Sequence, residues 1–156
     1  MKVIVTKNYD EMSEKAFKIV KDVVVNNKNA VLGLATGSTP LGLYAEMIKD
    51  HKENGTSYKD VKTLNLDEYA GLGITSDQSY VYFMRENLFK HIDIDLNNTH
   101  IENGKAVNRE LECKNYNELI EELPRDLQIL GIGSNGHIPF NEPGTAYDSE
   151  THIVDL

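Results

Sequence analysis

The chain has 156 residues, of which 40% are hydrophobic and 26% charged, a composition typical of a soluble protein with one packed core. Its formal net charge of -9 argues against general binding to nucleic acid, whose phosphates it would repel. A single cysteine, Cys113, excludes an intrachain disulfide and a cysteine zinc cluster. We see no signal peptide or apolar run long enough to span a membrane, so we expect one cytoplasmic domain over residues 1–156.

Short apolar runs alternate with longer stretches of helical spacing along the chain. The predicted strands are residues 2–5, 30–35, 62–66 and 126–132, with the start of another at 152–156. The predicted helices are residues 10–26, a helix beginning near Pro40 with Ser38 or Thr39 as its N-cap, and residues 79–91 and 109–123. This order predicts a doubly wound, mostly parallel α/β sheet with helices on both faces, Rossmann-like, in which 126–132 is a central buried strand.

Three unusual segments each follow a predicted strand directly. They are "TGSTP" at 36–40, "DEYAGL" at 67–72 and "GSNGH" at 133–137. In open α/β sheets, ligands bind outside the carboxyl ends of the strands, so these three segments point to one crevice.

The first of these segments has the composition of an anion-binding turn. Gly37 allows close approach of the backbone, and Ser38, Thr39 and the first helical N–H groups can face an anion. An ordinary capped helix start would look the same, and no Gly-Lys-Ser/Thr follows to make it a nucleotide loop. A phosphomonoester fits it better than a triphosphate.

The second segment places two acids, Asp67 and Glu68, after an apolar strand. A half-buried carboxylate at the carboxyl end of a strand can serve as a general base. The plainer alternative is a solvated acidic pair that opens a loop, with Tyr69 packing that loop.

The third segment, "GIGSNGHIPFNEP", surrounds one histidine with groups that could tune it. His137 can exchange a proton near neutral pH, Asn135 could bond the ring or the substrate, and Glu142 could orient the imidazole and stabilise its charged form. Its glycines, Gly131, Gly133 and Gly136, indicate backbone that is held close to another group or has an unusual φ.

The remaining histidines show no metal-ligand spacing, so we expect no metal. The residues alone therefore suggest an acid–base site with an anion cradle, suited to proton transfer on a small phosphorylated substrate.

Taken together, "GLATGSTP", "LNLDEYAGL" and "GIGSNGHIPFNEPGT" resemble the glucosamine-6-phosphate deaminase (glucosamine-6-phosphate isomerase) family in the right order over the whole chain. The resemblance implies a hydrolase of amino sugar metabolism that converts glucosamine 6-phosphate and water to fructose 6-phosphate and ammonia, without a cofactor. His137 would open the sugar ring, helped by Asn135 and Glu142. Asp67 would take the C2 proton and return it at C1. Substrate contacts would come from Ala35, Thr36, Gly37, Ser38, Thr39, Glu68, Gly131 and Gly133.

Two departures from the family pattern affect these expectations. Family members continue past "THIVDL" with further strands and phosphate-binding residues, so the chain resembles their N-terminal two-thirds. We therefore expect weak activity at this length, or a homo-oligomer that covers the open sheet edge. His152 and Val154 stand where regulated members carry basic residues, which argues against activation by N-acetylglucosamine 6-phosphate.

Two rival functions remain. A 6-phosphogluconolactonase would share the fold but lack the "FNEP" continuation after Gly-His, which this chain has. A domain that only binds a sugar phosphate would have no need for Asp67, His137 and Glu142. Turnover separates the enzymes from the binding domain.

Overall fold

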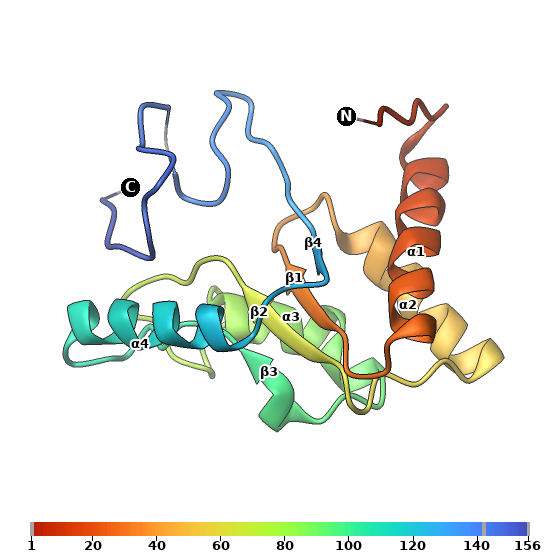
Figure 1. The fold of residues 1–156 in the computed structure, drawn as a ribbon, viewed down its shortest axis with the longest axis horizontal. Coiled ribbons are helices and arrows are strands. Elements are labelled where there is room, and N and C mark those ends of the chain that lie inside the picture. The colour runs from red at the N-terminus through yellow and green to blue at the C-terminus, as the bar shows by residue number, and fades with distance from the viewer. Residues whose placement is uncertain (1, 142, 156) are drawn as a thin grey trace.

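The computed structural model describes residues 2–141 and 143–155, and a four-stranded parallel sheet forms its centre (Figure 1). The strands are β1 (Val31–Leu34), β2 (Lys62–Asn65), β3 (Thr99–His100) and β4 (Leu127–Gln128), in the order β3-β2-β1-β4. Every residue of β1 is buried, as expected of a strand paired in parallel on both sides. The predicted parallel α/β fold is confirmed.

Helices cover both faces of this sheet. The helices are α1 (Tyr9–Asn26), α2 (Leu41–Asn54), α3 (Tyr80–Asn87) and α4 (Arg109–Glu122), with 3-10 turns at Phe89–His91 and Leu96–Asn98. The first three pack on one face and α4 on the other. Within the described residues, no helix is both long and apolar enough to cross a membrane.

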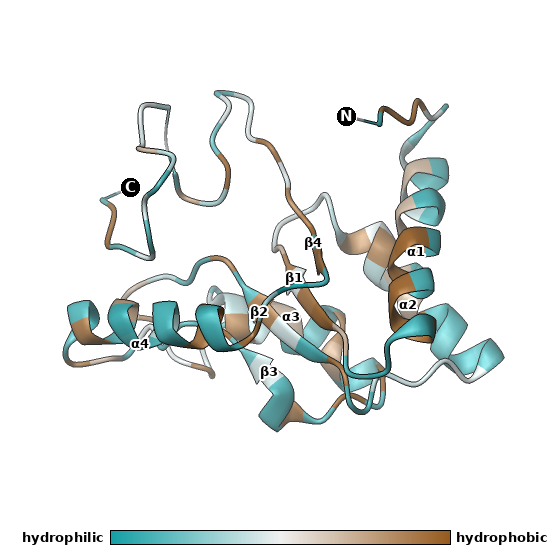
Figure 2. Ribbon diagram, viewed as in Figure 1, coloured by the Kyte–Doolittle hydropathy of each residue, from teal (hydrophilic) through white to brown (hydrophobic). Residues whose placement is uncertain are grey.

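The two-residue period of β1 sends its side chains alternately to the two faces. Leu32 and Leu34 join the larger core with α1, α2 and α3. Val31 joins Leu64 of β2 and Tyr116 of α4 in the smaller core. Apolar residues accordingly run along β1 and the adjacent parts of α1 and α2, whereas α4 is mostly polar (Figure 2).

The strand predicted at residues 2–5 is absent. Val3 is 71% and Val5 84% exposed, and the described part of 1–8 makes no sheet contact before α1 begins. An apolar run becomes a strand only where a neighbouring strand accepts its backbone hydrogen bonds.

The predicted strand at 126–132 is shorter than expected and lies at the edge rather than the centre. Only Leu127 and Gln128 pair, and they pair with β1 alone. Beyond them the chain leaves the sheet, which exposes Leu130 and Ile132. No strand forms over residues 152–155 either. The short strand β3 was not predicted from the sequence.

The predicted N-cap of α2 is also wrong. The N-cap is Pro40, which makes no side-chain cap bond, and the hydroxyl of Tyr9 on α1 takes its place. The Gly42 N–H donates to this hydroxyl over 2.7 Å, and the hydroxyl donates to the carbonyls of Ser38 and Thr39. A distant tyrosine thus binds an N–H group that the sequence had assigned to an anion.

The smaller core predicts a contrast between two leucines. Leu64→Ala should lower the free energy of unfolding by about 2–5 kcal/mol, because it removes a fully buried side chain under α4. Leu111→Ala on α4, where the side chain is 51% exposed, should cost well under about 1 kcal/mol. Urea denaturation of both variants measures the difference, and equal losses would contradict this packing.

Candidate active site

The three unusual segments leave the same edge of the sheet. They follow β1, β2 and β4, which run parallel. The last residues of β1 and β2 are register partners, Leu34 with Asn65, so the glycine-containing turn and the acidic segment begin at the same level. The segment after β4 extends from this edge in Figure 1.

Asp67 lies two residues beyond β2 in a half-buried position. Burial raises the pKa of its carboxyl to about 6, the negative charge of Glu68 adds to this rise, and the charge of His137 opposes it. Two residues that the sequence singled out therefore interact electrostatically. A carboxylate with a pKa in this range is well matched to proton abstraction near neutral pH.

Asn135 holds the imidazole of His137 in place. Its side-chain oxygen lies 2.7 Å from Nδ1 of the histidine and accepts the histidine backbone N–H over 3.2 Å. The contact at Nδ1 fixes the orientation of the imidazole ring. Glu142 lies outside the described residues, so its predicted part in this arrangement stays a prediction.

Two glycines make this turn around His137. Gly136 has φ +91°, which favours glycine, and its N–H donates to the Gly133 carbonyl. A Cβ at Gly133 would lie only 2.4 Å from the His137 ring, so only glycine leaves room for the imidazole. A Cβ at Gly131 would meet nothing.

Glu68 is bound to the backbone. Its carboxylate accepts N–H groups from Tyr69 over 2.7 Å, Tyr80 over 2.9 Å and Val81 over 3.0 Å. Negative charge at the start of α3 is favourable, since the unpaired N–H groups of a helix point there. The predicted substrate contact of Glu68 stays untested, and its evident work is to tie the acidic segment to α3.

Three aromatic rings connect the acidic segment, α3 and the segment after β4. Tyr69 lies 4.9 Å from Tyr80 and 5.2 Å from Phe140, centroid to centroid, and Tyr80 stacks on Phe140 at 5.8 Å. The side chain of Thr36, in the glycine-containing turn, lies near enough to lower the pKa of the Tyr80 hydroxyl, against the larger rise that burial causes. Of these three rings, the sequence predicts a packing role for Tyr69 alone.

The predicted substrate turn at 35–39 is divided between a cavity and the surface. Ala35 and Thr39 line a small cavity of about 230 Å³ together with Gly131. Gly37 has φ +86° and lies exposed beside Ser38. Substrate binding by these residues stays a prediction, but three of them share one hollow.

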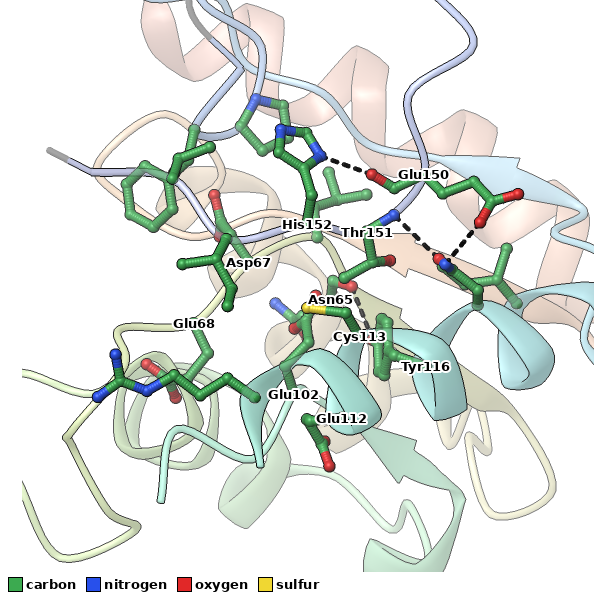
Figure 3. Close-up of a pocket in the computed structure, with 18 of the residues that line it drawn as sticks. Asn65, Asp67, Glu68, Glu102, Glu112, Cys113, Tyr116, Glu150, Thr151 and His152 are labelled. Carbon is green, nitrogen blue, oxygen red and sulfur yellow. Dashed lines mark hydrogen bonds between the residues drawn. The ribbon is translucent and has the colours of Figure 1, made fainter. Parts of the chain in front are cut away.

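Asp67 and Glu68 line a larger cavity of about 490 Å³ between β2, α4 and residues 149–154 (Figure 3). Thr151 fastens this last segment to α4 by donating its N–H to the Asn117 side chain over 2.9 Å. The cavity also contains Glu102, which sequence reasoning missed. Glu102 lies two residues beyond β3, as Asp67 lies two residues beyond β2, but the two-residue strand was too short to recognise.

The protein is therefore a parallel α/β protein in which an acid, Asp67, and a histidine, His137, interact beyond the carboxyl ends of the strands. The family model of glucosamine-6-phosphate isomerases and 6-phosphogluconolactonases matches residues 6–140, so the chain belongs to this family.

Relatives named glucosamine-6-phosphate deaminase are similar to the whole chain. One from Geobacillus sp. (strain WCH70) is 54% identical, and one from Clostridium botulinum (strain Langeland) is 52% identical. The chain spans 62% and 64% of their lengths. A solved structure described as a monomeric glucosamine-6-phosphate deaminase matches with a TM-score of 0.98 and 45% identity, over all of this chain and 65% of that one. A 6-phosphogluconolactonase from Thermotoga maritima, 23% identical over 86% of this chain and 60% of that one, shares the fold with a TM-score of 0.69.

The close contact at Gly133 predicts that Gly133→Ala displaces the imidazole of His137. The ring proton resonances of His137 should move, because a methyl group cannot fit 2.4 Å from the ring. Gly131→Ala is the matched control and should leave them unchanged. Proton NMR of both variants makes the measurement, and an unmoved ring in Gly133→Ala would refute the geometry.

The raised pKa of Asp67 predicts a stability gain on its removal. Because the folded pKa of about 6 exceeds the ordinary value of 3.8, the folded state loses stability as pH rises through this interval. Asp67→Asn should therefore raise the free energy of unfolding by about 1–3 kcal/mol near pH 7, and by less towards pH 4. Urea denaturation across this range tests the expectation, with exposed Asp60→Asn as the control. A pH-independent effect would contradict it.

Proposed function

We propose that the protein is a glucosamine-6-phosphate deaminase that converts glucosamine 6-phosphate and water to fructose 6-phosphate and ammonia. The observation that carries this proposal is the electrostatic pairing of a half-buried Asp67 with a His137 whose ring is held by Asn135. Identity above 50% to deaminases along the whole chain supports it. The chain spans less than two thirds of these relatives, so activity at this length is part of the proposal.

Each group has a defined task in this reaction. His137 moves a proton to the ring oxygen and opens the sugar to its aldehyde. Asp67 then removes the proton at C2, which forms an enolamine, and returns a proton at C1, which leaves a protonated imine at C2. Water adds to this carbon, and the amine leaves as ammonia. Every step moves only protons, water and ammonia, so electrons balance without an oxidant.

Within this proposal, the phosphate end of the substrate lies at the glycine-containing turn, away from the acids of the larger cavity. Glu68 contributes by fixing the acidic segment and by raising the pKa of Asp67. The cytoplasmic location and a homo-oligomer stay predictions.

A lactonase is the weaker alternative. It would need a water nucleophile at a lactone carbonyl but no base positioned to remove a carbon-bound proton. The similarity to a lactonase of solved structure lies in the fold, at 23% identity.

If the proposal is right, the purified chain in D2O exchanges the C2 proton of glucosamine 6-phosphate and converts this substrate to fructose 6-phosphate and ammonia. Asp67→Asn should lower the rate at least about a hundredfold, because a positioned base contributes on the order of that factor. Proton NMR follows C2 exchange, fructose 6-phosphate and ammonia separately, with exposed Asp60→Asn as the control. Hydrolysis of 6-phosphogluconolactone instead would favour the alternative, and binding without exchange would favour a sugar-phosphate-binding domain.

A further inference from the structure

The larger cavity contains buried polar atoms that have no partner among the described residues. Asn65 is 2% exposed, and neither its side-chain oxygen nor its nitrogen makes a hydrogen bond. Oε2 of Glu102 is buried and unpaired as well. Both residues line the cavity beside Asp67 (Figure 3). Buried polar atoms in folded proteins are nearly always satisfied, so these three atoms indicate a bound molecule.

The position of Asn65 does not depend on its side chain. The hydroxyl of Tyr116 on α4 donates to the backbone carbonyl of Asn65 over 2.7 Å and to that of His100 over 3.2 Å. These bonds hold the ends of β2 and β3 together and leave the amide of Asn65 to the cavity. The backbone of Asn65 and His100 is therefore held in place by Tyr116.

The charge of the cavity selects a cation. Six acidic side chains line it, against two arginines. Burial raises the pKa of Glu102 to about 8, and the charges of Asp67, Glu68 and Glu112 add to this rise. A positive ligand would relieve this repulsion, whereas a phosphate would increase it. Cys113 and Tyr116 of α4 face the same space.

A multivalent metal ion is a poor occupant. Within residues 2–141 and 143–155, no three His, Cys, Asp or Glu side chains gather closely enough to hold one. The acids surround the cavity instead of converging on a point. A small cation that is held by separate hydrogen bonds fits this arrangement better.

We propose that this cavity binds ammonium, the nitrogen product of the deamination, between the side-chain oxygen of Asn65 and the carboxyl of Glu102. This inference rests on the proposed function, because that reaction releases ammonia beside Asp67. Ammonium has four N–H donors, and Asn65 Oδ1 and Glu102 Oε2 are free acceptors. The cavity exceeds the size of ammonium, so water fills the remainder.

The proton balance of this step is simple. Ammonia leaves the sugar carbon uncharged, and a protonated Glu102 transfers its proton to it. Glu102 becomes a carboxylate and ammonia becomes ammonium, so the cavity keeps its total charge. The resulting charged pair is stabilised by a charge-assisted hydrogen bond.

Ammonium binding can be tested on the chain itself by NMR. Ammonium chloride should shift the side-chain amide resonances of Asn65 and the carboxyl carbon of Glu102 along a saturating curve. Tetramethylammonium chloride at equal ionic strength has no N–H donors and should leave both unchanged. A linear response, or the same response to both salts, would mean that the cavity holds water alone and would overturn the inference.

Variants locate the site. Glu102→Gln and Asn65→Leu should each weaken ammonium binding at least about tenfold, as read from the remaining resonance. Both keep the size of the side chain, and circular dichroism checks that they fold. Glu118→Gln, on the exposed side of α4, makes the same substitution outside the cavity and should bind ammonium as the natural chain does. Unchanged affinity in both cavity variants would also overturn the inference.

Kinetics separate this inference from the proposed function. In the reverse reaction, Glu102→Gln should raise the KM for ammonium about tenfold and leave the KM for fructose 6-phosphate within about twofold. Saturable binding without turnover would sustain the site and count against the activity. Turnover with an unchanged KM for ammonium would sustain the activity and refute the site.

Discussion

The parallel pairing of β1 with β2 is the constraint on which the rest of the structure depends. Its register places Leu34 opposite Asn65, so the turn after β1 and the acidic segment after β2 start side by side. Tyr116 extends the same level to β3 by bonding to the backbone of Asn65 and His100. Glu102 thereby joins Asp67 at one edge of the sheet. A slip in this pairing would move the acidic segment away from the turn after β1, because the register of the two strands sets where each segment begins.

The site is assembled at a cost in stability. Asp67 and Glu102 both have raised pKa values, mainly because burial disfavours their charged forms. Burial that destabilises a carboxylate also makes it a better base, so reactivity and stability oppose each other here. Glu68 has the opposite arrangement, with three N–H donors around its carboxylate. Two adjacent acids in one segment thus have opposite environments: burial raises the pKa of Asp67, whereas backbone N–H groups bind Glu68.

The sequence revealed the fold class and the chemical segments, because both depend on local patterns. Alternating apolar runs and helical spacing predicted β1, β2 and all four helices, and glycines and polar groups marked the strand ends. The sequence did not predict structure that depends on a residue far away along the chain. Residues 2–5 have the composition of a strand but no described partner, and β3 is too short to show a pattern. The cap on α2 comes from Tyr9, 33 positions before Gly42, whose N–H it accepts. Glu102 lies at the site because β3, which precedes it, pairs with β2.

The distribution of charge would also orient the proposed substrate. Glucosamine 6-phosphate carries a phosphate at one end and an amino group near the other. The phosphate would be repelled by the acids of the larger cavity and would lie away from them, towards the glycine-containing turn. The protonated amino group would have the opposite preference and would be attracted towards the ionised acids of this cavity, Asp67 among them. Both forces would favour the same orientation, with the amino-bearing end of the sugar, and therefore C2, towards Asp67. A sugar phosphate without the amino group would keep only the first of these two forces, so the acidic cavity would favour the amino sugar over its hydroxyl analogue.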